Sequence, residues 1–217
     1  MQTVAIGGLI GAGKTTAITA AAEALQAARP KTQVVAVFEP VDEWVRSGKL
    51  AEFYSAPDEH ALAFQKYVLQ TRVDAIVAAA AALDPNKPAV LLLDRGLDDD
   101  SGFARANHAL GNLTAAELEA YEAALAAAKD DVPLAARCPL RLWLEVPPAV
   151  CAERCAHRAR DAESAVSIDY LNCLDRFRPV VDDCIDGTAG PTVVAAALVA
   201  RIEQWLGSEK TRSPVCK

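Results

Sequence analysis

The sequence has no apolar stretch long enough to cross a membrane. Its N-terminus also lacks a basic segment followed by a cleavable apolar core, and instead goes directly into a short strand-like run. We therefore expect no membrane partner. The expected location is the cytoplasm or another reducing intracellular compartment.

Positive charge is scarce as well. The 22 Lys and Arg residues are outnumbered by 29 Asp and Glu residues, which gives a formal net charge of −7. A general nucleic-acid binder needs clustered Lys and Arg to neutralise the phosphate backbone. We therefore expect no nucleic-acid polymer as a partner, whereas a small anionic ligand needs only a local positive pocket.

The six cysteines include no C-x-x-C pair, so the usual zinc and redox spacings are missing. Reduced thiols are the favoured interpretation. Cys151 and Cys155 lie one helical turn apart with His157 nearby. A metal site there stays open beside the simpler interpretation of helix packing.

A phosphate-binding motif is present near the N-terminus. Residues 8–15 fit the pattern G-x-x-x-x-G-K-[ST] and directly follow a short apolar run. A buried strand that turns here into a helix aims backbone N–H groups and the positive helix end at one point, where a polyphosphate can bind. We expect Lys14 to neutralise the β- and γ-phosphates of ATP, and the Thr15 hydroxyl to bind the accompanying Mg²⁺. The alternative is a glycine-rich turn that binds nothing. The expected phosphate-binding residues of this loop are Gly8, Gly11, Ala12, Gly13, Lys14, Thr15 and Thr16.

Apolar runs alternate with helical patterns along the chain. This alternation predicts an α/β fold of three layers, of the P-loop NTPase type, with a five-stranded parallel sheet and helices on both faces. The expected strands are the run before Gly8, residues 33–38, 89–94 and 141–146, and a segment within 179–186 that could instead extend the preceding helix. The expected helices are residues 14–29, 58–83, 114–129 with a T-x-x-E capping box, one from 147 and one at 191–206. No repeat or linker argues for a second domain, so we expect one domain over residues 1–207 and a flexible tail over 208–217.

Polar residues follow the strands at their carboxyl ends, where parallel sheets bind ligands. Glu39 comes after the second expected strand, and we expect it to take the proton of the phosphoryl acceptor. Asp94 ends the third strand and is expected to bind Mg²⁺ directly or through water, with Arg95 facing the transferred phosphate. The alternatives are a capping role for Glu39 and ion pairing for Asp94 and Arg95.

Three arginines indicate a lid over ATP. Arg154 and Arg158 are four residues apart and share a helix face, and Arg160 follows two residues later. Three cations so close together repel each other unless an anion lies between them. The phosphates of ATP would be that anion when a lid carrying these arginines closes over the nucleotide. We expect this arginine-rich lid at about 156–166, with a solvated, salt-bridged surface as the alternative.

These residues together resemble the deoxynucleoside kinases, which include deoxycytidine, deoxyguanosine and mitochondrial thymidine kinases. The resemblance runs in order over residues 3 to about 178. It rests on Glu39-Pro40-Val41-x-x-Trp44, Phe64-Gln65-x-Tyr67-x-x-x-x-Arg72, Asp94-Arg95 and Arg154-x-x-x-Arg158-x-Arg160-x-x-Glu163. It implies transfer of the ATP γ-phosphate to the 5′-hydroxyl of a deoxynucleoside, with Mg²⁺ as cofactor and ATP and the deoxynucleoside as partners. We also expect a homodimer.

The resemblance further implies roles for single residues. Glu39 acts as the base on the 5′-hydroxyl, Arg95 contacts the region of the 5′-oxygen, and Gln65 hydrogen-bonds the edge of the base. Tyr54 and Glu163 fall where the family holds the sugar 3′-hydroxyl. The expected catalytic residues are Lys14, Glu39 and Arg95, and the expected nucleoside-binding residues are Glu39, Trp44, Tyr54, Gln65, Arg72, Arg95, Asp100 and Glu163.

Arg72 and Asp100 are similar to the pair that lines the base pocket in the deoxycytidine and deoxyguanosine kinase branch. Such a pair would leave donors and acceptors for an amino-bearing base and would crowd the methyl group of thymine. Our hypothesis is therefore deoxycytidine or a purine deoxynucleoside as substrate over thymidine. The alternative is an Arg–Asp pair that only fixes two helices.

The chain departs from the family pattern in three places. Gly96 stands where a side chain usually follows Asp94-Arg95, and the acidic segment LDDDSGFARA comes next, where aromatic residues are usual. Either Phe103 or Ala104 takes the base-stacking position. The region after Pro179, which would hold the adenine-binding loop, matches weakly.

Two other functions remain open. A thymidylate-type nucleoside monophosphate kinase would share the fold, the loop and the lid, but it needs cations near Glu39, and the segment EPVDEW supplies acids. A non-catalytic binding protein would resemble the deoxynucleoside-kinase-like subunit of respiratory complex I. The presence of Lys14, Glu39 and Arg95 speaks against it.

Overall fold

The computed structural model describes residues 1–137, 139–158 and 166–208. Its centre is a single sheet of parallel strands in the order β2-β3-β1-β4-β5. The strands are β1 (Gln2–Gly8), β2 (Gln33–Val37), β3 (Ala89–Asp94), β4 (Leu140–Glu145) and β5 (Asp183–Asp186). The predicted five-stranded parallel sheet is thus confirmed. Residues 183–186 form a strand and do not extend the preceding helix.

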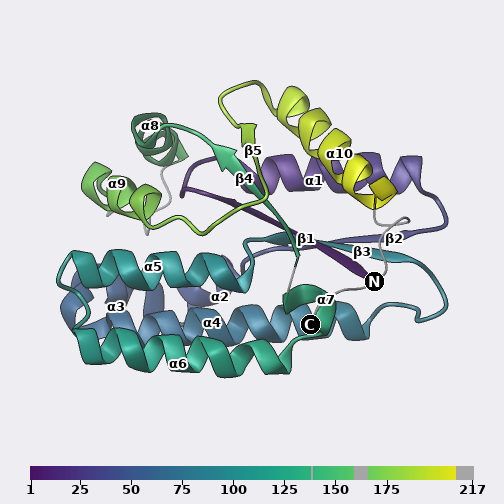
Figure 1. The fold of residues 1–217 in the computed structure, drawn as a ribbon. Coiled ribbons are helices and arrows are strands. Elements are labelled where there is room, and N and C mark those ends of the chain that lie inside the picture. Colours follow the sequence, from purple (N-terminus) through teal and green to yellow (C-terminus); the bar gives the residue numbers. More distant parts are fainter. Residues whose placement is uncertain (138, 159–165, 209–217) are drawn as a thin grey trace.

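Helices cover both faces of this sheet (Figure 1). One face carries α1 (Lys14–Ala28) and α10 (Pro191–Ser208), which pack against each other. The other face carries α4 (Pro57–Ala81), α5 (Leu97–Ala109) and α6 (Ala115–Asp131). The remaining helices are α2 (Val41–Arg46), α3 (Lys49–Ser55), α7 (Leu134–Arg137), α8 (Pro148–Arg158) and α9 (Ile168–Arg176). The three layers expected from the sequence are therefore present.

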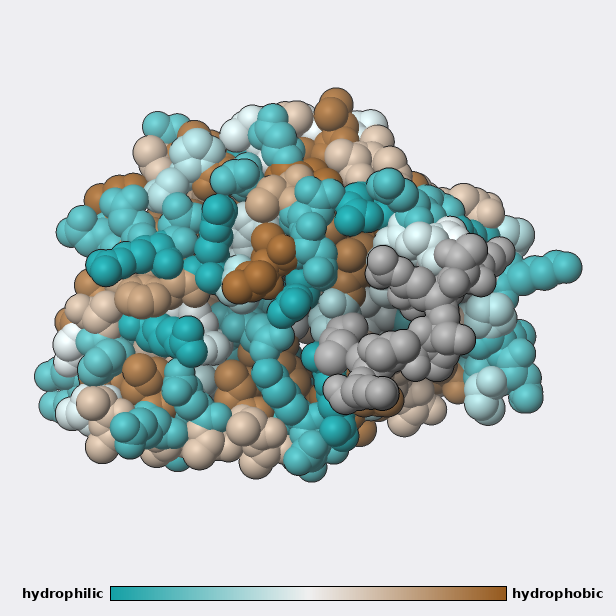
Figure 2. Space-filling view, in the orientation of Figure 1, coloured by the Kyte–Doolittle hydropathy of each residue, from teal (hydrophilic) through white to brown (hydrophobic). Residues whose placement is uncertain are grey.

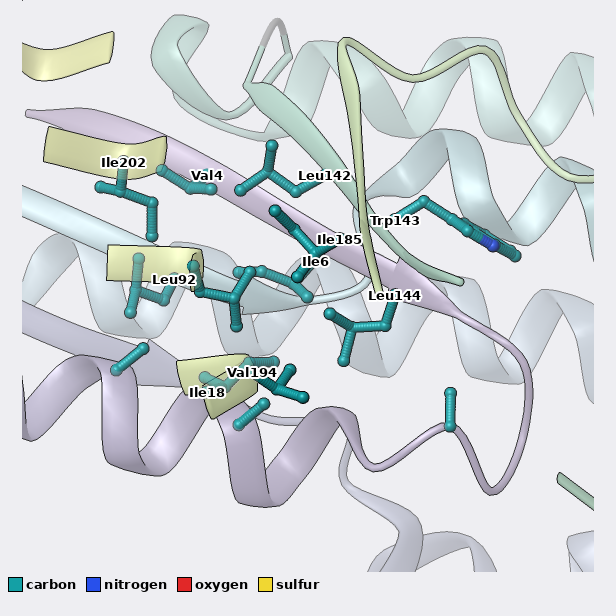
Figure 3. Packing of buried hydrophobic residues seen from close by; sticks show 14 of the residues in the cluster. Val4, Ile6, Ile18, Leu92, Leu142, Trp143, Leu144, Ile185, Val194 and Ile202 are labelled. Carbon is teal, nitrogen blue, oxygen red and sulfur yellow. The ribbon is translucent and has the colours of Figure 1, made fainter. Parts of the chain in front are cut away.

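The hydrophobic core has two halves, one on each face of the sheet. Because side chains alternate along a strand, Val4 and Ile6 face α1 and α10, whereas Ala5 belongs to the opposite half. Figure 3 shows Ile18 of α1 and Ile202 of α10 close to the strand side chains of the first half. Both halves leave the carboxyl ends of β1, β2 and β3 free for polar residues.

The helix boundaries include confirmations and corrections. The capping box is present, because the Thr114 hydroxyl accepts from the Glu117 N–H at 3.2 Å and the Glu117 carboxylate accepts from the Thr114 N–H at 2.8 Å. The expected end of the last helix at residue 206 is wrong, since α10 includes Gly207 and Ser208. The Ser208 hydroxyl donates to the Trp205 carbonyl at 2.8 Å and supports this last turn.

The face of the molecule in Figure 2 is largely hydrophilic, with apolar side chains in small separate groups. Among the described helices, none combines the length and the apolar character that crossing a bilayer requires. Within the same residues, no group of three or more metal-ligating side chains occurs, and Cys151 and Cys155 are buried and not in disulfides.

Candidate active site

The loop between β1 and α1 has the backbone conformation that its glycines predict. Gly11 and Gly13 adopt left-handed conformations with φ of 84° and 92°, which residues with a Cβ rarely adopt. A Cβ on Gly11 would lie 2.5 Å from the Cys151 carbonyl oxygen, so α8 packs directly on this loop. Gly13 caps the N-terminus of α1 without a side chain. Apart from the Ala12 N–H, which donates to the Leu9 carbonyl at 3.1 Å, the loop therefore leaves its backbone N–H groups and the positive helix end accessible to an anion.

Lys14 is enclosed by the loop. Its side chain is only 7% exposed, and its ammonium donates to the carbonyl oxygens of Gly8 at 3.4 Å and Leu9 at 3.2 Å. The Asp94 Oδ1 atom lies 3.9 Å from the ammonium. Burial, and then repulsion by Arg95, lower the pKa of Lys14 below its ordinary value. The charged form therefore gains from an additional anion at this position.

The side chains of Thr15 and Asp94 are in contact next to the phosphate loop. The Thr15 hydroxyl donates to Asp94 Oδ2 at 3.2 Å. Asp94 Oδ1 is buried and has no hydrogen-bond partner in the described part of the chain. A hydroxyl and a carboxylate with a free oxygen are the hard oxygen ligands that Mg²⁺ prefers, so these residues fit a magnesium site.

Glu39 lies just beyond β2, between two guanidinium groups. Its Oε1 accepts from Arg72 at 2.7 Å, and its Oε2 accepts from Arg95 at 2.6 Å. Burial alone would raise the pKa of Glu39, but the attraction of Arg95, Arg72 and Lys14 outweighs it and holds the pKa at about 2. The carboxylate is therefore ionised throughout the physiological range.

Arg95 connects this carboxylate to the phosphate loop. Its second Nη atom donates to the Gly8 carbonyl at 2.9 Å, and its guanidinium lies 4.8 Å from the centre of the Phe103 ring. The backbone of Arg95 is left-handed, with φ of 69°, which is uncommon for any residue except glycine. This conformation turns the side chain from the end of β3 towards Glu39.

Arg72 and Asp100 form a buried, two-pronged ion pair between α4 and α5. Arg72 donates to the two Asp100 oxygens at 2.9 and 3.0 Å, and to the Asp94 carbonyl at 2.8 Å. The side chains are 4% and 1% exposed. Burial raises the pKa of Asp100, and the attraction of Arg72 offsets this only in part. Two arginines thus connect Asp100, Glu39 and the phosphate loop.

A single cavity of about 350 Å³ extends from the phosphate loop to a pocket lined with aromatic side chains. Phe53 and Phe64 are stacked with ring centres 4.9 Å apart, and Trp44 meets Phe64 edge-on. The Trp44 indole N–H donates to the Thr71 hydroxyl, so this ring both packs in the core and lines the cavity. Gln65 is 3% exposed and also lines the cavity, and its amide has no hydrogen-bond partner among the described residues.

Most of the predicted site residues meet at this cavity. It is lined by Gly11, Gly13, Lys14, Thr15, Thr16, Glu39, Trp44, Tyr54, Gln65, Arg72, Asp94, Arg95 and Asp100. Gly8 and Ala12 belong to the loop but do not line the cavity. Arg154 donates to the Ala12 carbonyl at 3.2 Å and to the Gly187 carbonyl at 3.3 Å, which ties the loop to the turn after β5. Arg158 is the last residue of α8, and Arg160, Glu163 and most of the expected lid lie outside the described residues.

The cavity also includes aromatic residues that the sequence left undecided or unnoticed. Phe103 lines the cavity, whereas its neighbour Ala104 is fully buried. Tyr170 of α9 lines the cavity too, and burial raises the pKa of its phenol against the effect of a hydrogen bond with Asn107. To predict that these two side chains line the cavity, one would need to know which residues of α5 face the cavity and where α9 packs in the fold.

Comparison with known proteins decides which family this site belongs to. The sequence profile of the deoxynucleoside kinases matches residues 4–187, from β1 to just beyond β5. The chain belongs to the deoxynucleoside kinase family. The family consists of phosphotransferases.

Individual relatives of this kinase differ in the substrate that their names give. The chain is 28% identical to a probable deoxycytidine kinase of fowlpox virus over 79% of its own length and 67% of the relative's. It is 29% identical to the deoxyguanosine kinase of Dictyostelium discoideum over 58% of its length, and this match spans 43% of the relative. It is 30% identical to the thymidine kinase of Ictalurid herpesvirus 1, with 77% and 68% of the two chains covered.

A solved structure has the same fold as this kinase. The deoxyadenosine kinase of M. mycoides, solved with the products dCMP and a flexible dCDP bound, matches with a TM-score of 0.75. The match covers 94% of this chain and all of the other, at 19% sequence identity. At that identity the match shows the shared three-layer fold alone.

Proposed function

We propose that this kinase transfers the γ-phosphoryl group of ATP, with Mg²⁺, to the 5′-hydroxyl of a deoxynucleoside. The observation that carries the proposal is the single cavity that joins the phosphate loop to an aromatic pocket, with Glu39 and Arg95 at the junction. A phosphoryl donor and an acceptor hydroxyl bound at its two ends would meet at these side chains.

The donor side is supported by the loop geometry. The backbone N–H groups of Gly11 and of Gly13 to Thr16, together with the Lys14 ammonium, would bind the ATP phosphates. Thr15 and Asp94 would hold Mg²⁺, which supplies neutralising charge to the phosphate oxygens when bound. We propose that Arg154, Arg158 and Arg160 add positive charge from the lid.

On the acceptor side, Glu39 would receive a hydrogen bond from the 5′-hydroxyl. A carboxylate has about four acceptor positions, so two arginine contacts leave room for the hydroxyl. With a pKa of about 2, Glu39 is a weak base in the substrate-free protein. Because phosphoryl transfer has a loose transition state, the 5′-hydroxyl becomes acidic only late in the reaction. The orientation that Glu39 gives to the 5′-hydroxyl therefore matters more than the basicity of the Glu39 carboxylate. Arg95 would stabilise the charge on the transferred group.

The nucleoside would occupy the aromatic pocket. We propose that Gln65 hydrogen-bonds the base edge, since its amide lines the cavity and carries both a donor and an acceptor. Trp44 and its aromatic neighbours offer ring faces and edges to the base. Tyr54 and Glu163 would hold the 3′-hydroxyl.

For the base, we propose deoxycytidine or a purine deoxynucleoside over thymidine. The buried Arg72–Asp100 pair brings charged donors and acceptors to the pocket, which suits an amino-bearing base. The relatives named as deoxycytidine and deoxyguanosine kinases agree with this preference, and the relative named thymidine kinase does not.

An assay of the four deoxynucleosides and their monophosphates with Mg·ATP tests this function. We expect turnover of at least one deoxynucleoside and none of the monophosphates. Turnover of a monophosphate alone would favour the monophosphate kinase, and no turnover at all would favour a non-catalytic binding protein. We also propose a homodimer in a reducing intracellular compartment such as the cytoplasm, and light scattering of the purified protein tests the assembly.

A further inference from the structure

Asp99 is a buried carboxylate next to the site that the proposed reaction does not use. It is 7% exposed, and its Oδ2 accepts a hydrogen bond from the Gly96 N–H at 2.7 Å. Its Oδ1 is buried without a hydrogen-bond partner in the described part of the chain. This oxygen lies against β1, where a Cβ on Gly7 would come within 2.5 Å of it. A charged group in such surroundings costs stability, so a leucine-sized apolar side chain would suit the position better.

Backbone hydrogen bonds flank the left-handed Arg95 on both sides. The Arg95 N–H donates to the Ile6 carbonyl of β1 at 3.1 Å, and the next N–H along the chain, that of Gly96, donates to Asp99. The two peptide groups that flank Arg95 are therefore held by two different elements, β1 and α5. A left-handed backbone at a residue with a side chain persists only where its surroundings hold it, and these two bonds do so.

Among the described residues, Asp99 supplies the side-chain acceptor for the Gly96 N–H. Gly96 is the N-cap of α5 and has no side chain of its own, and a Cβ there would lie 3.0 Å from the Ala5 Cβ. The Asp99 N–H donates back to the Gly96 carbonyl at 3.1 Å, which closes the turn in both directions. Because β1 lies too close for a side chain at residue 96, the Asp99 carboxylate caps the Gly96 N–H at the start of α5.

We propose that Asp99 is a positioning residue for phosphoryl transfer, which keeps the Arg95 guanidinium between Glu39 and the phosphate loop. This inference rests on the proposed role of Arg95. A shift of the turn would move the guanidinium away from Glu39 Oε2 and the Gly8 carbonyl, which it contacts at 2.6 and 2.9 Å. Displacements of about 1 Å in a reacting group can cost about 100-fold in rate.

Three substitutions of Asp99 test the hydrogen bond. Asp99→Ala and Asp99→Leu remove the acceptor, and Leu keeps the shape of the side chain should Ala fail to fold. Asp99→Asn keeps an oxygen for the Gly96 N–H. We expect kcat to fall roughly 10- to 100-fold in Asp99→Ala and Asp99→Leu, while the KM values for both substrates change less than about threefold. In Asp99→Asn, kcat should stay within about threefold of the wild-type value.

Asp98→Ala is the matched control. Asp98 is the adjacent acid, but it pairs with Lys129 and Arg141, away from Arg95. Its variant should keep the kcat of the wild type. An equal loss of kcat in Asp98→Ala and Asp99→Leu, a loss confined to KM, or wild-type kcat in Asp99→Leu would overturn the proposal.

A measurement on the substrate-free protein tests the positioning role of Asp99 independently of the proposed kinase activity. Exchange of the Arg95 guanidinium protons, measured by NMR and assigned with an Arg95→Lys variant, should accelerate in Asp99→Leu but not in Asp99→Asn or Asp98→Ala. Unchanged exchange in Asp99→Leu would refute the positioning role. A wild-type protein that phosphorylates no deoxynucleoside would refute the proposed function instead.

Discussion

At the scale of single residues, the site is organised around charges that are paired with each other and shielded from water. Each oxygen of Glu39 accepts from one guanidinium group, and the carboxylate still lines the cavity with acceptor positions to spare. Pairs of this kind are costly to break, since removal of one partner leaves the other charge buried and uncompensated. The arrangement fixes the reacting groups before any substrate arrives.

Glu39→Gln should lower kcat about 100- to 10,000-fold and change the KM for the deoxynucleoside much less. The amide keeps the shape of the side chain but cannot accept the hydroxyl proton. Steady-state kinetics, with circular dichroism as the check on folding, measure the effect. Glu43→Gln is the control, because that acid bonds the Tyr67 hydroxyl instead. A kcat like that of the wild type in Glu39→Gln would remove Glu39 from the mechanism.

At the scale of secondary-structure elements, α4 and α5 are joined through the pocket by the Arg72–Asp100 pair. We expect the Arg72→Met, Asp100→Ala double variant to lose its preference for an amino-bearing base and to gain relative activity on thymidine. Comparison of kcat/KM for the four deoxynucleosides measures the change. The exposed ion pair between Arg105 and Glu122 links α5 to α6, and its double variant is the control. Thymidine as the best substrate of the wild type, unchanged in the variant, would contradict this expectation.

Helix α8 contributes Arg154, which bridges the phosphate loop and the turn after β5. Arg154→Ala should therefore raise the KM for ATP about tenfold and leave the KM for the deoxynucleoside unchanged, since it removes hydrogen bonds on the donor side only. Initial-rate measurements at varied ATP give the answer, with Glu153→Ala as the neighbouring control. An equal rise in both KM values would mean that Arg154 supports the fold in general.

The elements that the sequence predicted are those with a strong local signal. The strands are continuous apolar runs, and the glycines of the phosphate loop permit conformations that few other sequences adopt. The sequence analysis did not identify α2, α3, α5, α7 and α9, and of these α2, α3 and α7 are too short for a helical period to stand out. The cavity-lining position of Phe103, and not Ala104, depends on where α5 begins, and the role of Asp99 depends on a contact with β1 that lies far away in the sequence.

At the scale of the whole molecule, stability should respond to the protonation of Asp99. Burial raises the pKa of Asp99 from 3.8 to about 6, and repulsion by Asp100 adds to this rise. Arg95, the hydrogen bond from Gly96 and Arg72 lower the pKa and offset the rise only in part. Lys14 is a further nearby cation. A raised pKa means that folding favours the protonated form, so the part of the stability that Asp99 contributes is fully present below pH 3.8 and is lost as the pH rises through about 6. The loss attributable to this one group is on the order of 3 kcal/mol.

Asp99→Asn should therefore be at least as stable as the wild type at neutral pH. The amide keeps the hydrogen bond to Gly96 and removes the buried charge. Urea unfolding of both proteins at pH 4 and pH 7 measures this, and the advantage of the variant should increase with pH. Asp98→Asn, at a partly exposed position, should show no such trend. A variant less stable at pH 7 than at pH 4, relative to the wild type, would contradict the expectation.

The strand order also determines when the phosphate loop can form during synthesis of the chain. β1 is made first, yet its sheet neighbours are β3 and β4, and the latter begins at Leu140. At about 5–20 residues per second, a ribosome needs roughly 7 to 30 s to go from β1 to Leu140. Throughout that time the central strand has an unpaired edge, and ATP has no formed site to bind and stabilise. Variants that weaken the sheet should therefore be lost mainly to aggregation of the nascent chain, before any finished enzyme can be tested.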